Sequence, residues 1–276
     1  MNLQNIITEI EKVDPEVYER MDTRRDAMKS FAKTSGRIAL AALPLAFGSM
    51  LQKAYGQTSG TGLIVDTLNF ALTLEYLEAN FYTKAVATPG LIPTAPAQGA
   101  LSTIRDHENA HVAFLTTAIK SLNATPVSFT ADNFDFTAKG AFADVFSNYD
   151  TLLAVAQAFE DTGVRAYKGQ AGNLMSNNDV LTAALNIHSV EARHASHIRQ
   201  MRFARGATIK PWITKNITGI PASVFGVYNG EELSTQATIN IVNINGFDID
   251  ENAATEAFDE PLSKEAVLAI ASHFLK

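Results

Sequence analysis

The chain has 276 residues, enough for one large domain or two small ones. Hydrophobic residues make up 46% of it and charged residues 18%, which excludes global disorder and allows a sizeable buried core. Cysteine is absent, which excludes disulfides, thiolate metal ligands and cysteine nucleophiles. The formal net charge is −7 and no basic stripe is present, so nucleic acid is not an expected partner.

Residues 1–56 have the features of an export leader. Residues 23–29, Thr-Arg-Arg-Asp-Ala-Met-Lys, resemble a twin-arginine signal. The apolar run over 38–51 is too short for a stable membrane span and suits a signal peptide, and 54–56 offers small residues for cleavage. The alternative is a solvated helix followed by a buried apolar one. We therefore expect a bacterial protein that is periplasmic or otherwise exported, with no stable membrane span in the mature chain.

Residues 57–205 are expected to form one all-α domain, an antiparallel four-helix bundle. The apolar residues recur with helical periodicity, interrupted by proline, glycine and asparagine. The helices are predicted at 66–86, 100–122, 149–170 and 179–203, with Asp179 as the cap of the last one. A polar stretch over 123–140 is long enough to cross the length of a bundle between the second and third helices.

Residues 206–276 are predicted to be a loop-rich tail that packs on the bundle. Proline and glycine are frequent after residue 206, and Trp212 is a candidate anchor on the helices. A strand or extended segment is expected at 237–244 and a final helix at 263–275. The acidic residues over 248–252 are interpreted as a solvated turn, because the glycine and the final glutamate of a calcium loop are missing.

Glutamate is rare between residues 57 and 229, and each one stands in an apolar helical context. Helices that are apolar nearly all round are buried, and a buried carboxylate must be neutralised, paired or bound to a cation. The five glutamates are Glu75, Glu78, Glu108, Glu160 and Glu191.

Two of these glutamates are followed by histidine three residues later. His111 follows Glu108, and His194 follows Glu191. Residues three apart on a helix lie on the same face, so each pair can direct one carboxylate and one imidazole to a common point.

The glutamates also form a repeat. Tyr82 follows Glu75 by seven residues, and Tyr167 follows Glu160 by seven. Each of these helices precedes a Glu-x-x-His helix, so the sequence indicates two hairpins of one plan. Facing hairpins would bring four glutamates and two histidines together, which is the ligand set of di-iron and di-manganese carboxylate bundles.

On these motifs the sequence resembles the ferritin-like superfamily, and more narrowly the bacterial ferritin-like domain proteins related to plant desiccation-related proteins. The resemblance covers about residues 60–205. It implies a dinuclear site with dioxygen or peroxide chemistry, or metal handling. The metal ligands that it implies, which are also the residues expected to carry any catalysis, are Glu75, Glu108, His111, Glu160, Glu191 and His194.

Other residues have alternative interpretations. The six could form a buried ion-pair network without metal. Glu78 is a candidate seventh ligand, or a partner of a nearby backbone or arginine group. Tyr82 and Tyr167 are expected to donate hydrogen bonds to ligand carboxylates, the alternative being ordinary core tyrosines. The remaining histidines are expected at surfaces, helix ends or structural positions: His107, His188, His197 and His273.

The donor set favours two ions of iron or manganese, because it is rich in oxygen, holds two imidazoles and lacks sulfur. The negative charge of four carboxylates also equals the positive charge of two divalent ions. The sequence thus indicates an exported metal protein, with metal ions and dioxygen or peroxide as partners. One interpretation is a di-iron oxidoreductase of the ferroxidase or peroxidase type. The alternative is a stress-associated structural or binding protein whose metal site is only stabilising or vestigial. The choice between iron and manganese, and between a monomer and a homo-oligomer, stays open.

Overall fold

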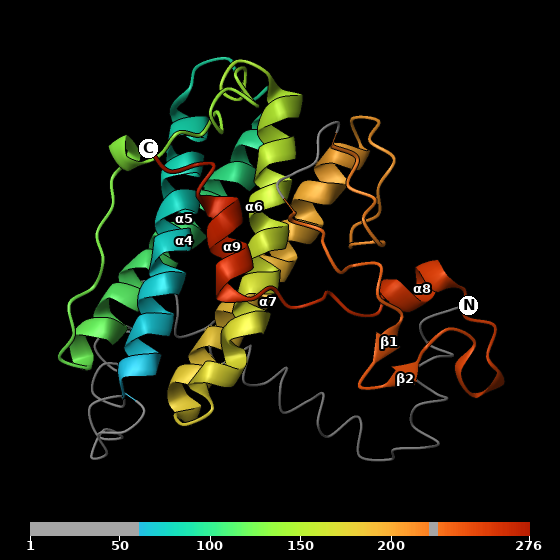
Figure 1. The fold of residues 1–276 in the computed structure, drawn as a ribbon. Coiled ribbons are helices and arrows are strands. Elements are labelled where there is room, and N and C mark those ends of the chain that lie inside the picture. The colour runs from blue at the N-terminus through green and yellow to red at the C-terminus, as the bar shows by residue number, and fades with distance from the viewer. Residues whose placement is uncertain (1–60, 221–225) are drawn as a thin grey trace, which may run out of the picture. The chain divides into compact units, whose positions relative to one another are not determined.

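Four long helices form the main body of the chain, which a computed structural model describes over residues 61–220 and 226–276. They are α4 (Thr61–Ala87), α5 (Ala95–Ser121), α6 (Tyr149–Gln170) and α7 (Asn178–Phe203). α4 lies against α5 and α6 lies against α7, so the helices form two hairpins (Figure 1). The predicted all-α four-helix bundle is confirmed. The predicted leader lies outside the described residues.

The first two helices begin earlier than predicted. α4 begins at Thr61 rather than at residue 66, and α5 begins at Ala95 rather than at residue 100. α5 includes Pro96 in its first turn, where proline removes no hydrogen bond that the helix would otherwise make. The side chain of Thr94 caps this helix by accepting a hydrogen bond from a first-turn amide. The proline was therefore a start signal rather than part of the preceding loop.

Asparagine side chains cap the other two long helices. Asn148 precedes α6, whose bounds agree with the prediction, and accepts hydrogen bonds from the amides of the first turn. Asn177 does the same for α7. The prediction of Asp179 as the cap of α7 is wrong, because Asp179 already lies inside the first turn.

Residues 122–148 connect the two hairpins. They contain one short turn of 3-10 helix, η1 (Ala131–Asn133), which contacts α4. In Figure 1 this connection passes from the end of α5 along the first hairpin to the start of α6. Phe134 forms an isolated β-bridge with Leu275, so the end of the chain is tied to this connection.

The remaining elements within residues 61–220 and 226–276 are short. They are η2 (Ala171–Leu174) between α6 and α7, and then β1 (Thr235–Gln236), β2 (Ile239–Asn240), η3 (Ile244–Gly246), α8 (Glu251–Thr255) and α9 (Lys264–Ala271). Of the strand or extended segment predicted over 237–244, only Ile239–Asn240 is a strand, and this β2 pairs with β1 as a small antiparallel hairpin whose turn has positive φ angles. The acidic turn predicted at 248–252 is instead the start of α8, which the side chain of Asp250 caps.

α6 is buried along most of its length. Every residue from 152 to 167 is buried, which requires neighbours on all sides of the helix. α4, α7 and α9 provide them. Phe274, just after α9, packs edge-to-face on Phe159 of α6 with the ring centroids 4.7 Å apart. The end of the tail is thus part of the apolar core. Among the described residues, no helix is both long and apolar enough to cross a membrane.

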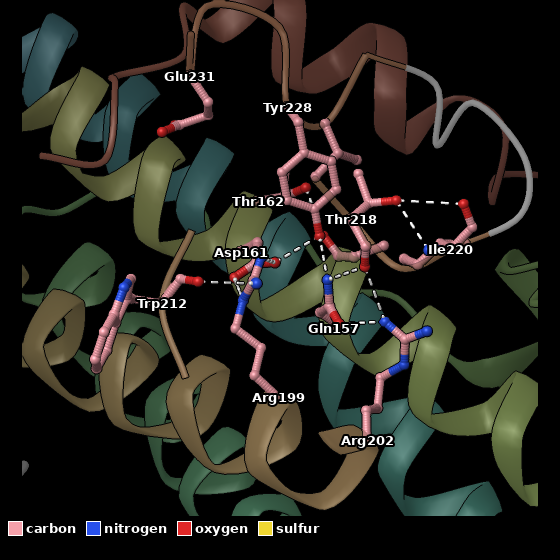
Figure 2. A network of polar contacts seen from close by, with 12 residues as sticks. Gln157, Asp161, Thr162, Arg199, Arg202, Trp212, Thr218, Ile220, Tyr228 and Glu231 are labelled. Carbon is pink, nitrogen blue, oxygen red and sulfur yellow. Dashed lines mark hydrogen bonds and ion pairs between the residues drawn. The ribbon is translucent and has the colours of Figure 1, made fainter. Parts of the chain in front are cut away.

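A buried polar network also joins α6 and α7 to the tail (Figure 2). Arg199 forms two hydrogen bonds to the carboxylate of Asp161, of 3.0 and 2.5 Å, and the hydroxyl of Tyr228 donates to the same carboxylate at 2.5 Å. Arg199 also donates to the carbonyl of Trp212 at 3.1 Å. Trp212 is 49% exposed, and this backbone hydrogen bond to Arg199 is one of its attachments to the helices.

Arg165 holds a second part of the tail against α6. Its fully buried guanidinium donates to the backbone carbonyls of Val227, Asn229 and Glu260 and forms an ion pair with Glu231 at 2.7 Å. The second carboxylate oxygen of Glu231 is buried without a hydrogen bond, and burial raises the pKa of Glu231 to about 7.

Candidate metal centre

Each of the four long helices contributes one glutamate to a buried cluster inside the bundle. The four carboxylates belong to fully buried residues, and the two histidines of the Glu-x-x-His motifs are almost as buried. The structure therefore brings together all six residues that the resemblance implied. They form two groups, and within each group one ligand atom of every residue lies within 4.8 Å of the others.

The first group contains Glu75, Glu108, His111 and Glu191. The Nδ1 atom of His111 lies 3.1 Å from Glu75, 3.2 Å from Glu108 and 3.0 Å from Glu191. The residues come from α4, α5 and α7, so three helices must be in register to build this group.

The second group contains Glu108, Glu160, Glu191 and His194. The Nδ1 atom of His194 lies 2.9 Å from Glu108, 3.4 Å from Glu160 and 3.2 Å from Glu191. The two groups are therefore built alike, and each has one glutamate and one histidine of its own.

Glu108 and Glu191 belong to both groups, and we refer to them as the shared carboxylates. Three buried oxygens of the cluster, Glu108 Oε1, Glu160 Oε2 and Glu191 Oε1, lie 2.9, 3.4 and 3.0 Å from a histidine Nδ1 atom but accept no well-formed hydrogen bond. Each of these Nδ1 atoms faces three carboxylates and carries at most one proton, so it cannot satisfy them all. Buried carboxylate oxygens without donors are costly unless a cation neutralises them. Oxygen atoms and neutral imidazole nitrogens are suitable ligands for iron or manganese, so the residues fit a metal ion in each group.

The two tyrosines cross between the hairpins. The hydroxyl of Tyr82 on α4 donates to Glu160 on α6, and the hydroxyl of Tyr167 on α6 donates to Glu75 on α4. Each tyrosine thus orients the unshared glutamate of the opposite hairpin. The two hydrogen bonds are related by the internal symmetry of the sequence, because each tyrosine lies seven residues after the cluster glutamate of the same helix.

The electrostatics of the cluster depend on burial. Burial alone would lower the pKa of His111 and His194, but the carboxylates around each ring raise both well above the ordinary range. Burial raises the pKa of Glu160 to about 7, in spite of the charge of His194 and the hydrogen bonds that favour its ionised form. The metal-free cluster therefore holds protons at neutral pH that a metal ion would displace.

Glu78 lies beside the cluster but belongs to neither group. It is buried, and it faces Gly163 of α6, where an added Cβ atom would lie 3.5 Å from its carboxylate. Burial, followed by the charges of Glu160 and Glu191, raises its pKa well above the ordinary value. The first hairpin thus brings one more carboxylate to the centre than the second.

His107 has a role at the site that the sequence interpretation missed. Its Nδ1 atom lies 2.9 Å from Nε2 of His194, and the two rings stack with centroids 5.2 Å apart. It therefore contacts the nitrogen of His194 that does not face the carboxylates. The only signal in the sequence was its position directly before Glu108. The remaining histidines, His188, His197 and His273, belong to neither group.

The family profile of the ferritin-like domain matches residues 64–204, just over half of the chain. The matched region includes both groups and most of the four long helices. The chain therefore belongs to the ferritin-like family, as its motifs predicted. No curated protein and no solved structure gave a significant match. The narrower likeness to desiccation-related proteins stays a prediction.

Proposed function

We propose that this protein holds two iron or manganese ions, one in each group, and uses them in a redox reaction with dioxygen or peroxide. The observation that carries the proposal is the sharing of Glu108 and Glu191 between two otherwise separate groups. Glu108 and Glu191 would each be available as ligands to both ions. Four carboxylates balance the charge of two divalent ions, so the buried centre would be neutral when filled.

The chain's own residues would set the properties of the bound ions. A bound pair of redox-active metals supplies the electron-transfer chemistry. Tyr82 and Tyr167 hold the two unshared glutamates by hydrogen bonds, and His107 contacts His194 from outside the cluster. Such outer contacts fix the orientation of ligands and tune the metal. The apolar helices around the site exclude bulk water from it.

Metal analysis with variants of the shared carboxylates tests the binding. The protein without its leader, filled under anaerobic conditions, is expected to hold about two ions per chain. Glu108→Ala and Glu191→Ala should each lose metal at both positions, because each removes a ligand from both groups. Glu232→Ala, at an exposed position, is the control. A wild-type plateau at zero or one ion would contradict the dinuclear site.

Thermal unfolding distinguishes a metal site from a metal-free ion-pair network. Metal should stabilise the wild type by mass action, by about 2.7 kcal/mol at a concentration one hundred times the dissociation constant. It should stabilise the two alanine variants much less. Without metal, Glu108→Ala should raise the melting temperature or leave it unchanged, because burial and the charge of Glu191 disfavour the ionised form of Glu108. A network without metal would show no response of the wild type to iron or manganese.

Oxygen consumption tests the redox part of the proposal. Addition of Fe(II) to the metal-free protein should be followed by uptake of dioxygen. Metal that stabilises the wild type without any uptake of dioxygen, and without any reaction with peroxide, would identify the site as structural. The stress-associated binding protein would then be the better description.

We also infer that the protein is exported by the twin-arginine pathway. The support is the motif over residues 23–29 and the short apolar run that follows it. The double variant Arg24→Lys, Arg25→Lys should stay inside the cell. Unchanged export of this double variant would show that the motif is incidental.

A further inference from the structure

A small apolar cavity lies inside the bundle. Its wall belongs to the end of the bundle where α4 and α7 begin and where α5 and α6 end, and these helix ends can be followed in Figure 1. We call it the end cavity. All four long helices contribute to its wall, and nearly all of the wall is apolar. Residues that define it are Leu68, Ala71, Phe114, Ala118, Tyr167 and Ala184. Of these, Phe114 is half-buried and the others are buried, so the cavity approaches the surface at Phe114.

The other side of the cavity reaches the candidate metal centre. Tyr167 is part of the cavity wall, and its hydroxyl donates to Glu75 of the first group. Leu74 is also in the wall and directly precedes Glu75 in α4. A molecule in the end cavity would therefore be separated from the first group by little more than the ring of Tyr167.

The size and lining of the cavity determine what can occupy it. Its free space is about that of one or two water molecules, which excludes hydrocarbon chains and larger organic molecules. Water and hydrogen peroxide would lose hydrogen bonds on entry, and the wall offers almost no polar surface in exchange. Apolar cavities of this kind stay dry and accept small apolar guests such as xenon. Dioxygen has the right size and needs no hydrogen bonds.

We propose that the end cavity binds dioxygen and passes it to the first group beside Tyr167, so that dioxygen, and not peroxide, reaches the centre by this route. The binding of dioxygen rests on the cavity alone. Its delivery to bound metal rests on the proposed function.

The binding can be measured in the metal-free protein, where no redox reaction occurs. Dissolved dioxygen is paramagnetic and speeds the relaxation of nearby methyl protons in nuclear magnetic resonance. In protein with labelled alanine methyl groups, dioxygen should enhance relaxation at Ala118 and Ala184 several-fold more than at Ala85 and Ala156. The latter two are as deeply buried but are not part of the cavity wall. Equal enhancement at all four positions would overturn the proposal.

A filled cavity provides the matched variant. Ala118→Leu should abolish the extra enhancement at Ala184, because the larger side chain occupies the space. Ala113→Leu places the same change on an exposed position of α5 and should leave it intact. Ala184→Val is a milder filling variant in case Ala118→Leu does not fold, with the readout then at Ala118. Enhancement that persists in a folded filling variant would contradict binding in this cavity.

The delivery step is tested on protein filled with Fe(II). Ala118→Leu should slow oxidation by dioxygen several-fold and leave oxidation by hydrogen peroxide unchanged, with Ala113→Leu behaving as wild type. Equal slowing with both oxidants, or with neither, would overturn the route. If wild-type protein binds no iron or oxidises none, the proposed function fails, whereas the metal-free measurement still decides whether the cavity binds dioxygen.

Discussion

At the scale of single residues, the two halves of the site share their ligand atoms but differ in their surroundings. His107 contacts His194, but the corresponding position before the second Glu-x-x-His motif is Val190, which has no polar side-chain atom. Glu78 likewise has Gly163 as its counterpart. The internal symmetry of the chain therefore applies to the ligands and the tyrosines, and not to the groups that support them.

The contact of His107 leads to a prediction about one of the two ions. His107→Ala removes the partner of His194 Nε2 and leaves all six ligands in place. Loss of such a supporting contact typically lowers metal affinity by about 10- to 100-fold. A competitive metal titration should show this loss for one ion and little change for the other. His197→Ala, an exposed histidine on α7, is the control. Equal weakening of both ions would indicate a general loss of structure instead.

The ligands could be predicted from sequence because their spacing is local. Glutamate and histidine three residues apart share a helix face wherever the helix packs. The role of His107 could not be predicted in this way, because its partner is 87 residues away on another helix. Which face of α5 meets α7 depends on packing that no short motif specifies.

At the scale of secondary-structure elements, α6 is enclosed by the bundle on one side and by the tail on the other. The closest approach is at Gly169, where an added Cβ atom would overlap the carbonyl of Leu262. Next to it, the amide of Leu262 donates to the carbonyl of Arg165 at 3.1 Å. The tail backbone therefore touches the helix directly, which only a residue without a side chain permits.

Two glycine variants test this contact. Gly169→Ala should lower the free energy of unfolding by about 2 kcal/mol or more, because the tail backbone must move to make room for the methyl group. The cost of this movement is larger than the gain from the higher helix propensity of alanine. Gly172→Ala is the matched control, since an added Cβ atom there meets nothing within 4 Å. Its effect should stay within about 1 kcal/mol. Urea unfolding monitored by circular dichroism measures both. Equal effects would mean that the tail does not press on α6.

The long helices were predictable, but the attachment of the tail was not. The bounds of α6 follow from its apolar periodicity and its Asn148 cap. In contrast, Arg165 donates hydrogen bonds to backbone carbonyls in irregular segments of the tail. Arg199 donates to one such carbonyl, that of Trp212, and pairs with Asp161 on another helix. A backbone carbonyl is present at every residue, so the sequence carries no mark of where such an arginine will bind.

At the scale of the whole molecule, burial of the ionisable cluster makes stability depend on pH and on metal. The pKa of Glu160 and that of Glu231 are both raised to about 7, above the unfolded value of roughly 4.3. A carboxyl group whose pKa is higher in the folded than in the unfolded protein stabilises the fold fully at a pH below its unfolded pKa. That stabilisation is lost as the pH rises through its pKa in the folded protein. The raised pKa values of His111 and His194 act in the same direction at higher pH.

The metal-free protein should therefore become less stable as the pH rises from 5 to 8, by on the order of a few kcal/mol. Glu160→Gln should reduce this dependence, because the amide does not ionise. With metal the trend should reverse, since ions compete with protons for the same atoms and bind more tightly at higher pH. Melting temperatures across this range, with and without Mn(II), provide the measurement. A metal-free melting temperature that rises with pH would contradict the assignment.

The burial of α6 by the tail also has a consequence for biosynthesis. Arg165 finds its partners between residues 227 and 260, and Phe159 finds Phe274, all of which follow α6 in the chain by more than fifty residues. A ribosome releases these segments after α6. Until then, α6 exposes a charged and apolar face that nothing covers, and buried polar groups without partners are costly. The nascent chain should therefore complete the cover of α6 only when these later segments have left the ribosome. That interval, with the carboxylates already synthesised and the tail not yet in place, is when metal could enter most easily.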